Sequence, residues 1–174
     1  MNTAYFAGGC FWCITPHFKA LNGVSAVTSG YSGGDEADPR YEDVKAQRTG
    51  HRETVRIDYD EATVSFETLL RVFLTGVDPF DGGGQFIDRG HSYTLAVYYQ
   101  TEEEVRTAEA MLEKIEKDFA RTPCIALEPF KSFFPAEEEH QDYYLKNPEK
   151  FESELLSSGR KKPGTPPTKE GLAL

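Results

Sequence analysis

The stretch AYFAGGCFWC, residues 4–13, decides how the first elements fold. Residues 4–7 have the apolar composition of a short strand, and the two glycines that follow end it. A helix is predicted over residues 10–21, although Pro16 must lie within or near its first turns and shorten or kink it. This strand-to-helix turn places Cys10 at the start of the helix.

A cysteine at a helix N-terminus lies next to main-chain N–H groups that have no partner in the helix, and at the positive end of its dipole. Both favour the thiolate and lower the pKa of a thiol, which makes Cys10 a candidate nucleophile. The two glycines before it allow another molecule to approach closely. Phe11 and Trp12 add an apolar surface that suits a methyl group on sulfur. The alternative is a turn whose side chains only pack inward, but packing does not call for a cysteine pair.

Composition limits the class of protein. A length of 174 residues with 39% hydrophobic residues predicts one domain with a true core. The net charge of −10 argues against nucleic-acid binding, which needs a basic face. Without a long apolar run or a signal peptide, we expect no membrane partner and a cytoplasmic location.

The charge is unevenly distributed along the chain. Residues 160–174 hold four basic residues and one acidic residue, which leaves a net charge of −13 on the rest. We expect a catalytic domain over residues 1–159, followed by a basic, mobile tail. An acidic body of this kind suits a neutral substrate, although surface charge mainly affects solubility.

The remaining elements follow from periodicity and from capping residues. We expect strands at 24–31, 53–59, 94–99 and 124–127, and helices at 41–47, 101–119, 141–146 and 149–158, with one more capped by Ser65. A long glycine-rich loop is expected at 78–91. The strand–helix–strand–strand–helix–strand order predicts an α+β domain. We expect a two-layer sandwich in which helices pack on a mixed sheet with a split βαβ, ferredoxin-like core.

Three cysteines, at positions 10, 13 and 124, are too few and odd in number for a secreted disulfide framework. A Cys-x-x-Cys pair in a reducing compartment indicates redox chemistry or half of a zinc site, with His17 one turn further on as a candidate third ligand. A structural zinc site commonly needs a second such pair, which is absent. Cys124, in an apparent apolar strand, is interpreted as a small core residue.

Several motifs in order resemble the A-type peptide methionine sulfoxide reductases. They include Gly-Cys-Phe-Trp-Cys at 9–13, Val-Thr-Ser-Gly-Tyr-Ser-Gly-Gly at 27–34, Thr-Gly-His-Arg-Glu at 49–53, Asp-Pro at 78–79, Asp-Arg-Gly-His-Ser-Tyr at 88–93 and Glu-Glu-His-Gln-Asp-Tyr at 138–143. The resemblance covers about residues 4–150. It implies thiol-dependent reduction of methionine (S)-sulfoxide, free or in peptides.

The resemblance assigns Glu53 as the acid that protonates the sulfoxide oxygen, and burial beside aromatic residues would raise its pKa as this role requires. Taken alone, Glu53 would be read as a solvent-facing strand carboxylate. Tyr41 and Tyr93 match the two tyrosines that hydrogen-bond the oxygen, a suitable task for a neutral phenol. Nothing but the motif match separates them from ordinary half-buried tyrosines.

The resemblance also places Asp88 and His140 around the same site, where they would orient Cys10 and water. Phe11 and Trp12 would form the pocket for the substrate's methyl group. The chain departs from the family where Thr15 and Pro16 replace a glutamate common in relatives. This should alter the opening of the helix and leave the proposed acid in place.

Attack by Cys10 would leave a sulfenic acid that a second thiol must remove. The tail contains no cysteine, so the resolving thiol is Cys13, Cys124 or an external reductant. We predict Cys13 because of its spacing, and the resemblance implies that thioredoxin reduces the Cys10–Cys13 disulfide. No bound cofactor or metal is expected, and the protein is expected to be a monomer.

Two alternatives remain from the residues alone. A general thiol–disulfide oxidoreductase would use the same cysteine pair without needing Glu53, and a zinc-binding module would lose its fold in chelator. The triple glycine at 82–84 lacks the Lys-Ser/Thr of a phosphate-binding loop. It is interpreted as a bend that carries Asp88 and Tyr93 towards the site.

Overall fold

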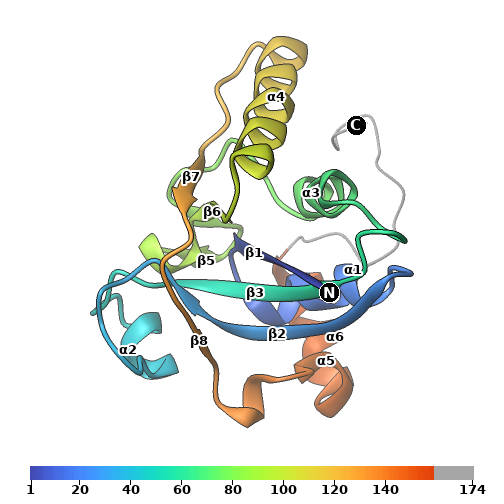
Figure 1. Ribbon diagram of the computed structural model, residues 1–174. Helices are drawn as coiled ribbons and strands as arrows, with labels where there is room; N and C mark the ends of the chain where they lie inside the picture. Colours follow the sequence, from blue (N-terminus) through green and yellow to red (C-terminus); the bar gives the residue numbers. More distant parts are fainter. Residues whose placement is uncertain (159–174) are drawn as a thin grey trace.

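The computed structural model describes residues 1–158, and the tail predicted at 160–174 lies outside this range. Six strands form one sheet in the order β7-β6-β1-β3-β2-β8 (Figure 1). They are β1 (Asn2–Gly8), β2 (Val24–Ser32), β3 (Arg52–Tyr59), β6 (Leu95–Tyr99), β7 (Ile125–Pro129) and β8 (Phe133–Pro135). Within the sheet, β6 and β7 pair in parallel and the other neighbours are antiparallel.

The helices lie close to their predicted positions. They are α1 (Phe11–Lys19), α2 (Tyr41–Lys45), α3 (Phe66–Thr75), α4 (Glu102–Phe119), α5 (Tyr143–Lys146) and α6 (Pro148–Ser158). The side chain of Ser65 caps α3 by accepting a hydrogen bond from the main-chain N–H of Thr68 at 3.1 Å. α1 continues through Pro16 to Lys19, so the proline does not end it. The predicted mixed sheet with packed helices in one domain is confirmed.

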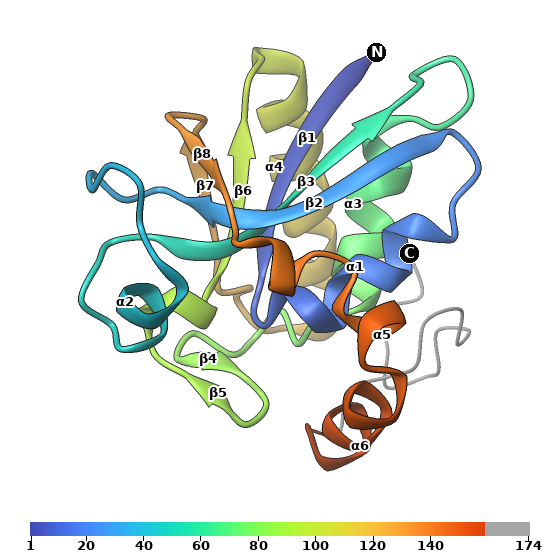
Figure 2. The same cartoon turned by 90° about the horizontal axis from the view of Figure 1, so that it is seen from below.

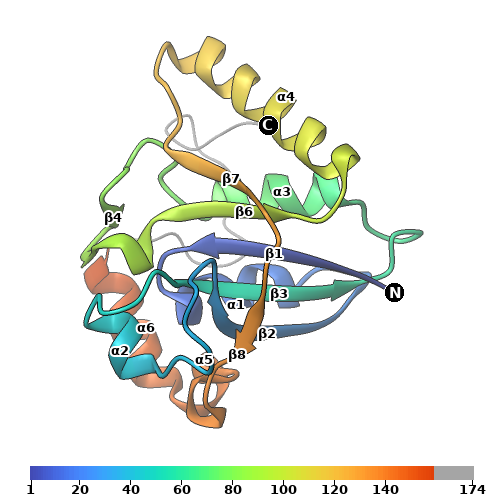
Figure 3. The same ribbon diagram turned by 60° about the vertical axis from the view of Figure 1, so that its left-hand side comes forward.

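Successive side chains of β1 point to opposite faces of the sheet and pack against the elements that cover each face. On one face, Phe6 packs against Phe18 of α1 and Phe73 of α3, with ring centroids 5.8 and 5.0 Å apart. On the other face, Tyr5 stacks on Phe130 at 4.2 Å and contacts Phe133. These last two rings lie on the segment that runs from β7 to β8, which crosses the sheet in Figure 3.

The glycine-rich segment is more ordered than expected. It contains a two-stranded hairpin, β4 (Gly84–Gln85) and β5 (Asp88–Arg89), followed by a short 3-10 helix, His91–Tyr93. The buried Gln85 side chain fixes the loop by exchanging two hydrogen bonds of 2.8 Å with the main chain of Asp78. Amide side chains can replace main-chain pairing in this way, which hydrophobic periodicity does not reveal.

The prediction for Cys124 is wrong. The residue precedes β7 instead of lying within it, and its side chain is exposed. Its main-chain N–H donates to the carbonyl of Pro79, and its sulfur lies 3.6 Å from the carbonyl of Phe80. Burial is only a tendency of free cysteine, and here the following strand starts one residue later than the apolar run suggested.

The chain brings several elements together at one end of the sheet. Gly8, the last residue of β1, pairs with Leu95, the first residue of β6. The start of α1 and the 3-10 helix therefore meet at this end of the sheet. Figure 2 shows α2, the β4–β5 hairpin and α6 at the same end. None of the helices within residues 1–158 combines the length and apolar character that crossing a bilayer requires.

Candidate active site

Cys10 is the N-cap residue of α1, in the position predicted. Its carbonyl accepts a hydrogen bond from the main-chain N–H of Cys13 at 3.1 Å, which closes the first turn. The helix approaches β1 so closely that a Cβ on Gly8 would lie 2.9 Å from a methyl carbon of Ile14. Gly9 adopts a φ of +83°, which an L side chain rarely allows. The two glycines therefore serve the turn that presents Cys10.

A cavity of about 220 Å³ lies against this turn. It is lined by Cys10, Trp12, Cys13, Tyr41, Lys45, Ile87, Asp88, Tyr93 and Glu154. Most of the predicted site residues thus come together from the first helix, α2, the hairpin and the 3-10 helix. Cys10 is half-buried and lines this cavity.

Glu53 is buried directly behind the cysteine turn, with 1% of its surface exposed. Its Oε1 accepts a 3.1 Å hydrogen bond from the main-chain N–H of Phe11, and among the described residues Oε2 has no hydrogen-bond partner. Burial raises the pKa of Glu53 to about 8, helped by the charge of Asp88 and opposed by the Phe11 N–H. A carboxyl with this pKa is largely protonated at neutral pH and can donate a proton.

The two predicted tyrosines both line the cavity. Burial, followed by the nearby carboxyl of Glu53, raises the pKa of Tyr41 and that of Tyr93 above the ordinary value for a phenol. Both phenols are therefore neutral hydrogen-bond donors over the physiological range. Donors of this kind stabilise an oxygen that gains negative charge, provided that they are held in place before the reaction.

Glu137 holds Tyr41 in position, a role that sequence reasoning missed. One carboxylate oxygen accepts from the main-chain N–H of Tyr41 at 3.2 Å, and the other accepts from the hydroxyl of Tyr31 at 2.9 Å. The residue lies beside the Glu-Glu-His motif, but nothing in the sequence indicates which tyrosine it contacts.

Aromatic rings support the cavity wall from behind. Trp12 stacks on Tyr143 with centroids 4.0 Å apart, and His140 stacks on Tyr41 at 4.2 Å. The indole N–H of Trp12 donates to Nδ1 of His140 at 3.2 Å. Burial lowers the pKa of His140, so the ring is neutral near pH 7 and accepts this bond. His140 thus contacts two lining residues without lining the cavity itself.

Phe11 takes a different place from the one expected. Its ring is fully buried between Trp12, Tyr31 and Tyr41, and it is not among the residues that line the cavity. Trp12 supplies the apolar surface next to the sulfur. Phe11 contributes to the site through its main-chain N–H and by packing beneath it.

The structure adds three lining residues that the sequence analysis did not name: Lys45, Ile87 and Glu154. Lys45 lies four residues after Tyr41 on α2, so the two share one face of that helix. This spacing is a signal that could have identified it. Ile87, at the tip of the hairpin, is 64% exposed, and Glu154 comes from α6, beyond the recognised motifs.

The two remaining cysteines differ in their relation to the cavity. Cys13 is 4% exposed and lines it, three residues after Cys10 in the same turn. Cys124 is not among the lining residues. Within residues 1–158, the one group of side chains arranged to hold a metal ion is Glu137, Glu139 and His140, which includes neither cysteine.

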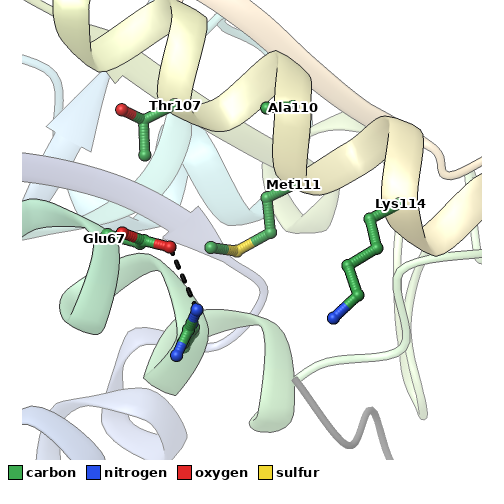
Figure 4. Close-up of a pocket in the computed structure, with 6 residues that line it drawn as sticks. Glu67, Thr107, Ala110, Met111 and Lys114 are labelled. Atoms are coloured by element: carbon green, nitrogen blue, oxygen red, sulfur yellow. Dashed lines mark hydrogen bonds and ion pairs between the residues drawn. The ribbon is translucent and has the colours of Figure 1, made fainter.

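A larger hollow of about 370 Å³ lies between α3 and α4, away from the thiols (Figure 4). Its walls include Met111, Lys114 and an ion pair in which Arg71 donates to Glu67 at 3.0 Å. Within the described part of the chain, the lining of this hollow contains no cysteine, and its one carboxylate, Glu67, is paired with Arg71. The chemistry therefore belongs to the smaller cavity at Cys10.

Comparisons with known proteins point to one family. The family model described as peptide methionine sulfoxide reductase matches residues 2–168. The chain is 42% identical to peptide methionine sulfoxide reductase MsrA 2 of Staphylococcus aureus, over 91% of this chain and 90% of that protein. It is 43% identical to the MsrA of Halalkalibacterium halodurans, over 92% of each.

Solved structures share the fold. Reduced Mxr1 of Saccharomyces cerevisiae matches with a TM-score of 0.79 at 26% identity, covering 84% of this chain and 86% of that one. Mxr1 in complex with Trx2 matches with a TM-score of 0.55 at 18% identity, over 82% and 84% of the two chains. The resemblance found in the sequence motifs is confirmed, and the chain belongs to the peptide methionine sulfoxide reductase family.

Proposed function

We propose that the chain reduces methionine (S)-sulfoxide, free or in peptides, to methionine, and that Cys10 is the nucleophile. One observation carries the assignment of roles. The main-chain N–H after Cys10 binds Glu53, a buried carboxyl with a pKa of about 8, beside a cavity lined by two neutral tyrosines. A thiolate, an acid and two phenols are the groups that sulfoxide reduction needs.

In the first step, the thiolate of Cys10 attacks the electrophilic sulfur of the sulfoxide. The proton of Glu53 moves to the sulfoxide oxygen, and Tyr41 and Tyr93 donate hydrogen bonds to that oxygen as it gains charge. Transfer of the hydroxyl group to Cys10 then releases methionine. The cysteine is oxidised to a sulfenic acid, and the substrate is reduced by two electrons.

In the second step, the thiol of Cys13 attacks the sulfenic acid, which forms a disulfide and releases water. Residues three apart on a helix have Cβ atoms about 5–6 Å apart, whereas a disulfide needs about 3.5–4.5 Å. The first turn of α1 must therefore tighten by about 1–2 Å. Position in the same cavity lining favours Cys13 over Cys124.

A thioredoxin dithiol then reduces the Cys10–Cys13 disulfide by thiol exchange. The family and the complex of yeast Mxr1 with Trx2 support this partner. No bound cofactor enters the proposed cycle, because thiols supply all the electrons. A monomeric state, a cytoplasmic location and a catalytic domain that ends at residue 159 stay predictions.

We also propose that the core belongs to the ferredoxin-like, two-layer class. The chain order β1–α1–β2–β3–α3–β6, with the sheet order β6-β1-β3-β2, supports a split βαβ arrangement.

Turnover of the two sulfoxide epimers tests the function. Each epimer of N-acetyl-methionine sulfoxide methylamide would be incubated with dithiothreitol and either the wild type, Cys10→Ser or Glu53→Gln. We expect reduction of the S epimer alone, loss of activity in Cys10→Ser and a sharp fall in Glu53→Gln. If Glu53→Gln retained full activity, general thiol–disulfide exchange would become the better account.

A further inference from the structure

Two oppositely charged side chains at the cavity have no role in the proposed chemistry. Lys45, at the end of α2, and Glu154, on α6, both line the cavity that holds Cys10. Figure 2 shows α2 and α6 on either side of the β4–β5 hairpin. Among the described residues, Lys45 is the only basic one in the lining, which also contains Asp88.

Neither side chain belongs to an ion pair in the part of the chain that the structure describes. Within residues 1–158, Lys45 and Glu154 form no ion pair with each other or with another side chain, and the ammonium of Lys45 lies 5.7 Å from the centre of the Tyr41 ring. Elsewhere on this surface, opposite charges do pair, as with Lys19 and Asp142 at 2.6 Å. Lys45 and Glu154 thus line the cavity without forming an ion pair within residues 1–158, and Asp88 is a second acidic residue in the lining.

The position of the sulfur fixes which part of the substrate reaches these charges. When the sulfoxide sulfur contacts Cys10, only two methylene groups separate it from the α-carbon, which must therefore lie within or near the same cavity. A free amino acid carries an α-carboxylate and an α-ammonium at that carbon, whereas a residue within a peptide carries two uncharged amides. Charged partners can distinguish the two forms.

We propose that Lys45 binds the α-carboxylate and Glu154 the α-ammonium of free methionine sulfoxide, so that this pair selects the free amino acid over peptide substrates. The inference rests on the proposed function and deepens it. The strongly acidic surface would otherwise repel the carboxylate, and Lys45 is placed to offset that repulsion. Asp88 adds a second carboxylate to the cavity lining, which favours an ammonium over an uncharged amide.

Four forms of the S-sulfoxide separate the two contacts. They are the free amino acid, the N-acetyl form that keeps only the carboxylate, the methylamide that keeps only the ammonium, and the form blocked at both ends. We would measure kcat/KM for each with dithiothreitol in the wild type, Lys45→Met, Lys45→Arg and Glu154→Gln. Lys114→Met on α4, at the separate hollow, is the matched control.

Each kcat/KM is divided by the kcat/KM of the same variant for the doubly blocked form. This division cancels any change in the chemical step that all four substrates share. We expect Lys45→Met to lower this ratio about 10- to 100-fold for the two substrates with a carboxylate, the size of one charge-assisted hydrogen bond. Glu154→Gln should do the same for the two substrates with an ammonium. Lys45→Arg should restore most of the ratio, and Lys114→Met should not change it.

Equal changes for all four substrates in Lys45→Met, or no change in any ratio, would overturn the proposal while leaving the reductase function intact. A wild type that reduces none of the four would instead contradict the proposed function. The two failures are therefore distinguishable in one set of assays.

Discussion

The main-chain N–H of Phe11 donates a 3.1 Å hydrogen bond to Oε1 of Glu53. Phe11 is the first helical residue after the proposed nucleophile, so this bond ties the acid on β3 to the turn that presents Cys10. An N–H donor favours the charged carboxylate, but burial has the larger effect, and the pKa of Glu53 rises to about 8. The same contact thus positions the acid without removing its proton.

Glu53→Gln should lower kcat for sulfoxide reduction by about 10²–10⁴-fold, the range for loss of a general acid, with a much smaller effect on KM. In the wild type, kcat/KM should fall as the pH rises through about 8, because Glu53 then loses the proton that it must donate. Steady-state rates from pH 6 to 10 test both points. If Glu53→Gln kept the same fall in kcat/KM at alkaline pH, that fall would be due to the ionisation of another group.

The stability of the fold should also depend on Glu53. Its pKa is near 4.5 when exposed and about 8 in the folded state, so the folded protein holds the extra proton between these values. Stability is therefore highest at the acid end of this window and is lost as the pH rises towards 8, by on the order of a few kcal/mol. Urea unfolding at pH 6 and pH 9 should show this loss in the wild type and a smaller one in Glu53→Gln. Equal losses in both proteins would contradict it.

The pattern of the sequence predicted most of the sheet and all the longer helices, because their apolar periodicity and caps are local signals. Ser65 and the spacing after it were sufficient for α3. The hairpin near Asp88 was missed because Gln85 and main-chain groups hold it, and β8 was missed because it has only three residues. Neither carries a hydrophobic period.

The site residues also differ in whether local sequence signals could predict them. Cys10 followed from helix physics, whereas Glu53 and the tyrosines needed family resemblance, since a carboxylate on a strand is ordinarily exposed. Glu154 lies 144 residues after Cys10, and only the packing of α6 brings it to the cavity. Contacts over such separations are properties of the folded chain, and a single sequence does not contain them.

Tyr41→Phe and Tyr93→Phe should each lower kcat about 10-fold, and the double variant by more, because each removes one donor to the developing oxygen charge. Folding should be little affected, since the rings remain. Stopped-flow measurement of methionine release in a single turnover isolates this step from reductant recycling. Tyr144→Phe is a matched control, because Tyr144 is not among the cavity lining residues. A single-turnover rate unaffected in the double variant would rule out the two phenols as donors.

Glu137→Gln should weaken the position of Tyr41. The carboxylate accepts from two donors, the Tyr41 N–H and the Tyr31 hydroxyl, whereas an amide offers a single acceptor oxygen. We expect a kcat about 5- to 10-fold lower, the cost of about one hydrogen bond, with an unchanged pKa on the alkaline limb set by Glu53. A shift of that limb with normal kcat would show that Glu137 acts on the acid instead.

Two variants distinguish Cys13 from Cys124 as the resolving thiol. Cys13→Ser should lose turnover with thioredoxin, because the disulfide that thioredoxin reduces cannot form, while Cys124→Ser should retain it. Mass mapping of the oxidised wild type should find the Cys10–Cys13 disulfide. If Cys124→Ser lost thioredoxin-dependent turnover and Cys13→Ser kept it, the assignment would have to be reversed.

A single turnover without reductant tests the role of Cys10 most directly. The fully reduced Cys13→Ser/Cys124→Ser protein would be mixed with one equivalent of the S-sulfoxide, and methionine and the intact protein mass would be measured together. We predict one equivalent of methionine and a gain of one oxygen atom at Cys10, trapped by dimedone as a sulfenic acid. Methionine formed without oxidation of Cys10, or no methionine at all, would contradict attack by Cys10 on the sulfoxide sulfur.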